Sequence, residues 1–196
     1  HQQIFDTTKQ FVEKEINPHA DEWEREGLWP AREIFTKMGA LGLLGINKPE
    51  AVGGLGLDYS FQVMFAEALG HCKVGGIPMA IGVQTDMATP ALARVGNDYL
   101  KDNYLKPAIK GEHVACIAVS EPGAGSDVAG IKTTARREGG DYVVNGQKMW
   151  ITNGAQGDWA CVLANTGEVS PEGGRHSNKS LIVVPLDAKG IDRKTK

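Results

Sequence analysis

Hydrophobic residues at the start of the chain recur at the spacing of an α-helix. Four of them follow one another at intervals of seven, four and seven residues, with charged residues between them: Phe5, Val12, Ile16 and Trp23. This spacing places the four side chains on one face of an amphipathic helix. We therefore predict a helix that begins near Asp6 and is interrupted or kinked at Pro18, whose ring is incompatible with a helix interior.

The helical period continues through most of the first 112 residues. A second helix is predicted after Pro30, a favoured first-turn residue, with Gly42 as its stop signal. A glycine-rich loop is predicted over 47–58. Three further helices are predicted over 59–72, 75–95 and 100–109.

At Glu112 and His113 the hydrophobic period changes to about two residues, the spacing of a β-strand. We expect a domain boundary there, between a helical domain over 1–112 and a β-domain over 113–196. Asn145-Gly146 lies between two β-rich runs and predicts a hairpin with a type I′ turn. The predicted hairpin spans 142–152, and a polar loop is predicted over 166–179. The other predicted strands are 114–119, 133–137, 159–164 and 180–185.

An all-helical block followed by closely spaced short strands indicates an α+β fold. We expect an N-terminal all-helical domain followed by an antiparallel β-barrel-like middle domain. The chain starts within a helical pattern and ends without a stop signal, so we expect a piece of a longer protein. The barrel would then be truncated at its C-terminal end, with an exposed strand edge.

The composition is that of an ordinary globular protein. Of the 196 residues 41% are hydrophobic and 23% charged, which argues against disorder. The net charge of −3 gives no reason to expect nucleic acid as a partner, and no apolar run is long enough to span a bilayer. The three cysteines and five histidines lack the spacing of a disulfide framework or a metal site, so we expect reduced thiols, an intracellular location and no metal.

A polar loop follows the first predicted strand, within the run from Ile117 to Asp127. A proline and two glycines permit tight or positive-φ turns, so successive backbone N–H groups can converge on an anion. Ser120 and Ser126 add hydroxyl groups on either side. An ordinary turn between strands has the same composition, and the loop alone leaves both interpretations open.

The glycines of this loop argue against two common nucleotide sites. Gly123 and Gly125 lack the third glycine and the following helix of a dinucleotide fingerprint, and no Gly-Lys-Ser/Thr sequence indicates a P-loop. In an alternating strand Trp150 and Thr152 would point to one face, which suits a planar ligand that carries a phosphate. Core packing for Trp150 and a cross-strand pair for Thr152 are the simpler alternatives.

Three segments of the chain resemble one protein family. The segment 118–130, AVSEPGAGSDVAG, is similar to the signature of the flavin-dependent acyl-CoA dehydrogenases. The segment 146–154, GQKMWITNG, resembles that family's second flavin segment, and 49–58 resembles its N-terminal loop. The similarity covers essentially the whole chain and implies a helical domain followed by a middle β-barrel, the order that the periodicity predicts.

The resemblance implies an FAD site. The positions that match the family's cofactor-binding residues are Ile117, Val119, Ser120, Gly125, Ser126, Trp150, Ile151 and Thr152. It implies that Val119 and Ser120 meet the pyrimidine edge of the flavin. It places Gly125 and Ser126 at the pyrophosphate, with Ser126 also touching the acyl-CoA substrate.

The resemblance further implies that Trp150 packs against the flavin ring and that Thr152 is hydrogen-bonded near N5, the atom that accepts hydride. Two positions depart from the common pattern. Ile117 stands where many members have an aromatic residue, and Ser120 stands where threonine is common. These departures leave the flavin assignment in place and leave the subfamily open.

The implied reaction is α,β-desaturation of an acyl thioester, in which a carboxylate removes the α-proton and FAD accepts the β-hydrogen as hydride. In this family the glutamate base lies in a C-terminal helical domain, which this chain does not contain. We therefore assign no catalytic residue. Glu121 lies next to the expected site, and we interpret it as a structural acceptor for loop amides.

The resemblance also implies a fatty acyl-CoA substrate, an electron-transfer flavoprotein or similar acceptor, and a homo-oligomer in the full-length protein. It suggests the mitochondrial matrix in a eukaryote or the cytoplasm in a bacterium. Two alternatives stay open at this stage: an acyl-CoA oxidase or flavin monooxygenase on the same scaffold, and a truncated, non-catalytic binding fragment.

Overall fold

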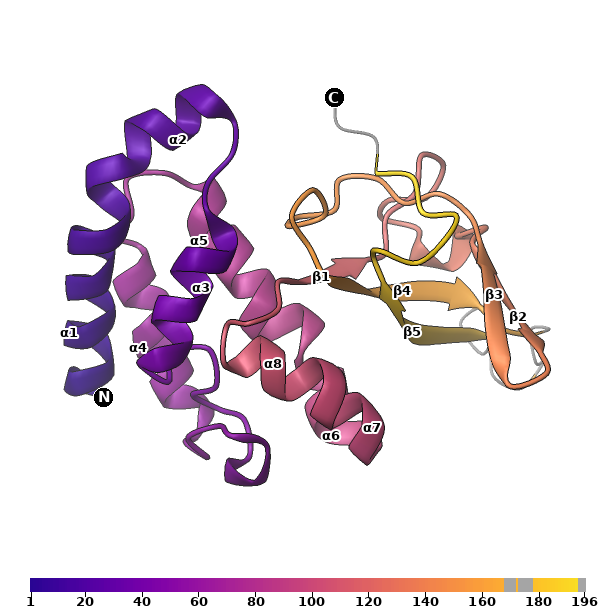
Figure 1. Cartoon of the computed structure of the whole chain (residues 1–196), viewed down its shortest axis with the longest axis horizontal. Coiled ribbons are helices and arrows are strands. Elements are labelled where there is room, and N and C mark those ends of the chain that lie inside the picture. Colours follow the sequence, from indigo (N-terminus) through magenta and orange to yellow (C-terminus); the bar gives the residue numbers. More distant parts are fainter. Residues whose placement is uncertain (168–171, 173–177, 194–196) are drawn as a thin grey trace.

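A computed structural model describes residues 1–167, 172 and 178–193. Figure 1 shows a group of helices on one side and a small sheet on the other, joined where α8 leads into β1. The described α-helices are α1 (Gln2–Phe11), α2 (Ala20–Glu26), α3 (Ala31–Ala40), α4 (Tyr59–Leu69), α5 (Gly76–Gly82), α6 (Pro90–Val95), α7 (Asp98–Leu100) and α8 (Lys106–Ile109). Three π-helical turns continue or connect them, over Val12–Ile16, Val83–Ala88 and Lys101–Leu105.

The predicted helices are present, with some shifted boundaries. The prediction that the first helix begins near Asp6 was wrong, because α1 begins at Gln2 and the N–H of Phe5 already donates to the carbonyl of His1. Pro18 lies in a short 3-10 turn between the first helical segment and α2, so the interruption is confirmed. Helix α3 follows Pro30 directly.

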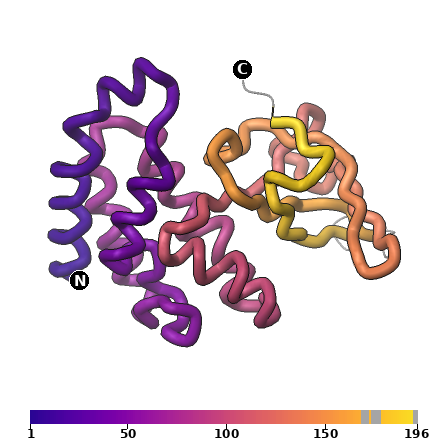
Figure 2. Tube along the Cα trace, viewed as in Figure 1, coloured from indigo at the N-terminus to yellow at the C-terminus, as the bar shows by residue number. Residues whose placement is uncertain are grey.

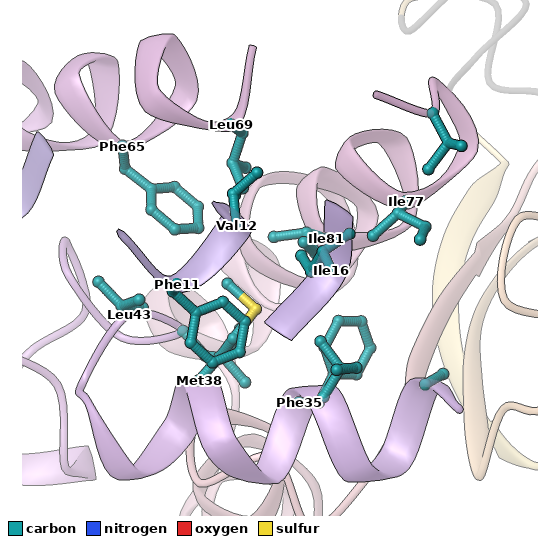
Figure 3. Close-up of a cluster of buried hydrophobic side chains, with 14 of the residues drawn as sticks. Phe11, Val12, Ile16, Phe35, Met38, Leu43, Phe65, Leu69, Ile77 and Ile81 are labelled. Atoms are coloured by element: carbon teal, nitrogen blue, oxygen red, sulfur yellow. The ribbon is translucent and has the colours of Figure 1, made fainter. Parts of the chain in front are cut away.

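The helical half has its own hydrophobic core. Val12 and Ile16 follow α1, and they pack with Phe35 and Met38 of α3 and Phe65 of α4, all five fully or almost fully buried. Figure 3 shows these side chains converging between the helices. Each such side chain stabilises the fold by about 1.5–3 kcal/mol relative to leaving it in water.

The sheet is mixed. It comprises β1 (Ala115–Ala118), β2 (Thr134–Glu138), β3 (Asp141–Asn145), β4 (Trp159–Asn165) and β5 (Lys179–Pro185). β4 pairs in parallel with β1 and antiparallel with β5, while β2 joins β4 through one parallel pair and β3 through an antiparallel ladder. The α+β order of the fold is confirmed. The expectation of a wholly antiparallel sheet was wrong, because the long segment between β1 and β4 brings the chain back to start β4 in the same direction.

The predicted hairpin turn at Asn145-Gly146 was also wrong. β2 and β3 form the hairpin instead, with Gly139 at the turn in the left-handed region (φ +62). Asn145-Gly146 and Gly139-Gly140 are both turn signals. Gly139 supplies the positive φ that this hairpin needs. Gly146 follows the end of β3, where a Cβ would overlap the side chain of Thr133, so its role is close approach of two segments.

The polar loop predicted over 166–179 lies largely outside the described residues. Its two described ends are connected, because the N–H of Thr166 donates to the carbonyl of Asn178 at 2.7 Å. This bond closes the loop between β4 and β5.

A buried glutamine connects the helical half to the first strand. The amide nitrogen of Gln84 donates to the carbonyls of Ala108 (3.0 Å) and His113 (2.8 Å), and its oxygen accepts from the N–H of Ala115 (2.7 Å). Its side-chain amide therefore makes three hydrogen bonds in a residue that is only 1% exposed. The bonds fix the point at which β1 leaves the helices.

An ion pair makes a second connection. Arg32 of α3 donates to Asp158, which lies just before β4, and to the carbonyl of Glu112. The other oxygen of Asp158 accepts from the N–H of Val114 at 2.7 Å. Figure 2 shows the segment between β3 and β4, in orange, reaching back toward the helices. None of the helices in the described part of the chain combines the length and the apolar character needed to cross a lipid bilayer.

The approach of α3 to the end of α8 depends on two glycines. A Cβ on Gly39 would overlap the carbonyl oxygen of Lys110, and a Cβ on Gly111, whose φ is +75, would overlap the carbonyl oxygen of Phe35. This contact also sets where β1 begins, because β1 starts four residues after Gly111.

We predict that Gly39→Ala lowers the free energy of unfolding by about 1–3 kcal/mol, because the backbone must move apart to admit the methyl group. Gly82→Ala is the matched control, since it lies at the end of α5 with nothing within 4 Å of its Cβ position. That substitution should stabilise the protein by about 0.5–1 kcal/mol through helix propensity. Urea unfolding followed by circular dichroism measures both, and equal effects of the two substitutions would contradict the close contact.

Candidate functional site

The loop after β1 lies beside the segment that contains Trp150. The N–H of Met149 donates to the carbonyl of Ser120 at 3.0 Å. The ammonium group of Lys148 donates to the carbonyl of Val119 at 2.8 Å. The two sequence motifs that resemble flavin segments are therefore joined through backbone and side-chain hydrogen bonds, although no strand ladder connects them in the described residues.

Glu121 is the acceptor at the centre of this contact. Its carboxylate accepts from the N–H of Lys132 (2.7 Å), the N–H of Thr133 (3.0 Å) and the ammonium of Lys148 (2.9 Å). The side chains of Glu121 and Lys148 are only 6% and 11% exposed. Burial acts to raise the pKa of Glu121, but the hydrogen bonds from Lys132, Thr133 and Lys148 outweigh it and hold the pKa at about 2. The structural acceptor role expected for Glu121 is confirmed.

The loop itself is a tight turn. Glu121 and Ala124 exchange two backbone hydrogen bonds, at 3.0 and 3.1 Å. The turn is made without positive φ at Gly123 or Gly125. Both lie in open space, because nothing lies within 4 Å of the Cβ position of either residue. Gly125 and Ser126 are both exposed residues.

Trp150 is not part of a strand. Its φ is +61 and its side chain is 71% exposed, so the prediction that alternation places it on one face with Thr152 was wrong. The alternative that it packs in the core was wrong too. A left-handed conformation of a bulky residue costs roughly 1–2 kcal/mol, and such outliers cluster at functional sites.

The residues after Trp150 return to the body of the protein. Ile151 packs against the buried cluster that includes Cys116 and Ala118 of β1. Thr152 lines a cavity rather than a strand face. Asn153 has φ +68, which asparagine tolerates, and its amide nitrogen donates to the carbonyls of Ala80 (3.0 Å) and Ala115 (3.2 Å).

This cavity, of about 400 Å³, opens between the helices and the segment 151–156. The wall on the side of the helices includes Trp23 of α2, Trp29 of the connection between α2 and α3, and Ile77 of α5. Sequence reasoning missed this wall, because nothing in the local sequence connects Trp23 or Trp29 with a segment more than a hundred residues away. It also missed Lys148 and Asn153, although both belong to a segment that the resemblance singled out.

The other predicted positions lie close to the same place. Val119 and Ser120 are partly buried, and their carbonyl groups accept the hydrogen bonds from Lys148 and Met149. The side chain of Ile117 packs against a cluster that includes Trp159. Ile117 therefore packs β1 against this buried cluster. In the described part of the chain, no three His, Cys, Asp or Glu side chains are grouped so that they could hold a metal ion.

Family models match almost the whole chain. The acyl-CoA dehydrogenase N-terminal domain matches residues 1–112, and the acyl-CoA dehydrogenase middle domain matches residues 116–196. The chain belongs to the acyl-CoA dehydrogenase family. It is 36% identical over 192 residues to the human mitochondrial short-chain specific acyl-CoA dehydrogenase. The matched region covers 97% of this chain and 45% of that protein.

Two further members illustrate the range of relatives. The chain is 39% identical over 165 residues to the mitochondrial isovaleryl-CoA dehydrogenase of Solanum tuberosum, covering 84% of this chain and 40% of that one. The crystal structure of an acyl-CoA dehydrogenase complexed with FAD from Bacillus anthracis has a TM-score of 0.87 and 33% identity, covering 100% of this chain and 32% of that one. The chain spans about half the length, or less, of the curated relatives that it matches.

The residues present fit the FAD that the family uses. The site offers an exposed aromatic side chain at Trp150, the exposed residues Ser126 and Gly125 with their hydroxyl and backbone N–H groups, and open space at the two loop glycines. A dinucleotide with a planar ring and a pyrophosphate needs donors and an aromatic surface of this kind.

We predict that the stabilisation contributed by Glu121 is lost in acid. Its pKa is about 2 in the folded protein against 4.5 for the free side chain, so the stabilisation is present above about pH 4.5 and is lost as the pH falls toward 2. The shift corresponds to roughly 3 kcal/mol at most. The difference in unfolding free energy between the native protein and Glu121→Gln should therefore shrink from pH 6 toward pH 3, as measured by urea unfolding. Glu138→Gln, an exposed change on β2, controls for the loss of one charge, and a pH-independent effect of Glu121→Gln would contradict the assignment.

Proposed function

We propose that this chain forms the flavin-binding part of an acyl-CoA dehydrogenase that desaturates a fatty acyl-CoA thioester between its α and β carbons. Residues 1–112 are proposed as the helical domain and 113–196 as the β-domain. The observation that carries the proposal is the contact between the loop after β1 and the segment 148–150, which brings the two motifs together beside an exposed tryptophan.

The proposed FAD contacts follow from these positions. Ser126 and Gly125 present a hydroxyl and a backbone N–H that suit the pyrophosphate, and Ser126 is also proposed to touch the acyl-CoA. Val119 and Ser120 are proposed at the pyrimidine edge. When bound, FAD supplies the acceptor for the hydride that leaves the β-carbon.

The other face of the proposed flavin site comes from the second segment. The indole of Trp150 offers its plane to the ring, and Thr152, in the wall of the cavity, is proposed to donate a hydrogen bond near the ring nitrogen that accepts hydride. Ile117 and Ile151 are also proposed to contact FAD, and each packs against a buried cluster of the protein.

Removal of the α-proton needs a carboxylate that can accept a proton and reach the substrate. Glu121 does not qualify, because its carboxylate is buried, accepts three hydrogen bonds and has a pKa of about 2. Glu121 is therefore not assigned as the base, and we propose, from the family resemblance, that a glutamate of a C-terminal helical domain outside this chain removes the α-proton. The role of this part of the chain is to bind and orient the flavin and the thioester.

We further propose an electron-transfer flavoprotein, or a similar protein acceptor, as the partner that reoxidises the flavin, and a homo-oligomer as the assembled enzyme. Family membership supports both. The relatives named above are mitochondrial in human and potato, which supports the mitochondrial matrix if the source is eukaryotic. A bacterial source would imply the cytoplasm.

In the full-length protein, Trp150→Ala and Ser126→Ala should each lower flavin retention, because each removes a proposed contact with FAD. Loss of the aromatic contact of Trp150 is worth roughly 0.5–1.5 kcal/mol, or an affinity about twofold to thirteenfold weaker. The measurement is the ratio of visible flavin absorbance to protein after purification. Tyr142→Ala, which removes an exposed aromatic from β3, is the control. Unchanged absorbance of both variants would contradict the proposed site.

A further inference from the structure

The segment that carries Trp150 contains two residues in the left-handed region, and neither is glycine. Trp150 has φ +61 and Asn153 has φ +68. Asparagine tolerates this conformation, but a tryptophan in it is a genuine outlier. Burial does not compensate, because most of the indole surface is exposed. A strained conformation of this kind persists only where surrounding contacts determine it.

Lys148 fixes the segment on its N-terminal side. Its ammonium group bonds to the carbonyl of Val119 at 2.8 Å and to the carboxylate of Glu121 at 2.9 Å. Glu121 is itself held by two backbone N–H groups, so the partner of Lys148 is a fixed point. The next residue, Met149, bonds through its N–H to the carbonyl of Ser120.

Asn153 fixes the segment on its C-terminal side. One amide group donates to the carbonyl of Ala80 in α5 and to the carbonyl of Ala115 at the start of β1. This side chain therefore attaches the segment to both halves of the molecule. Ile151, between the two attachment points, packs into the core of the sheet.

We propose that Lys148 and Asn153 are positioning residues that hold Trp150 in its left-handed conformation and so present the indole to the flavin. The proposal rests on the proposed function, because it takes FAD as the ligand. Both residues act through Trp150, and they fix its backbone relative to the loop of residues 119–127 before FAD binds. Such preorganisation lowers the ordering cost of binding.

The test is a double-mutant cycle in the full-length protein, with the dissociation constant of FAD measured by flavin fluorescence. Lys148→Met should weaken FAD binding by about tenfold when Trp150 is present, and by less than about threefold in a Trp150→Ala background. Lys148→Arg keeps the cation and should recover most of the affinity. Gln147→Met, an exposed change one residue away, is the matched control and should leave the affinity unchanged.

A second measurement needs no cofactor. Hydrogen exchange of the Met149 amide, which bonds to the carbonyl of Ser120, should be faster in flavin-free Lys148→Met than in the native protein or in Lys148→Arg. Asn153→Ala should show the same dependence on Trp150 in the FAD cycle. It also provides the test if Lys148→Met lacks a native circular dichroism spectrum.

The outcomes separate the two proposals. If Trp150→Ala does not weaken FAD binding, the proposed flavin site fails. If Trp150→Ala weakens binding but Lys148→Met and Asn153→Ala weaken it equally in both backgrounds, the two residues contribute only to general stability, and the positioning role is overturned. Loss of affinity that depends on Trp150, together with faster exchange at Met149, supports it.

Discussion

The carboxylate of Glu121 holds together two stretches of chain that are far apart in the sequence and that form the proposed flavin site. It belongs to the loop after β1, and its cationic partner, Lys148, lies in the segment before Trp150. Removing two opposite charges from water is costly, and such pairs persist where further hydrogen bonds satisfy them. Two backbone N–H groups also donate to the carboxylate of Glu121, and the ammonium of Lys148 donates a second bond to the carbonyl of Val119.

The helical half gives this arrangement its fixed position. Gln84 sets the start of β1, and Arg32 holds Asp158 just before β4. Asn153 then ties the segment of Trp150 to α5 and to β1. The strain at Trp150 is sustained by contacts at both ends of its segment, and the cavity beside Thr152 exists because helices form its opposite wall.

Much of the fold could be predicted from local pattern. Pro30 marked the start of α3, and short continuous runs of apolar, β-favouring residues predicted β1 and β4, because such runs and helix-start signals are properties of neighbouring residues. The hairpin could not be assigned correctly, because Asn145-Gly146 and Gly139-Gly140 are both turn signals and the choice depends on which strands pair. The parallel pairing of β1 with β4 depends on contacts between residues more than forty positions apart.

The candidate site shows the same division. The resemblance pointed to Trp150 and Thr152 as flavin-site residues. The alternation of a strand, which was expected to place them on one face, is absent, because neither residue lies in a strand. The functions of Lys148 and Asn153 depend on hydrogen bonds to carbonyl groups of distant segments. Every residue has a backbone carbonyl, so the sequence does not show which of them accept these bonds. The carbonyl partners of Lys148 and Asn153 could therefore not be inferred before the fold was known.

A crystal structure of the full-length protein with FAD bound tests the central claim most directly. We expect the flavin ring to pack against the indole of Trp150, Ser126 to contact the pyrophosphate, and Lys148 to remain hydrogen-bonded to Glu121. FAD bound away from Trp150, or a bound state in which the loop of residues 119–127 separates from Lys148, would contradict it.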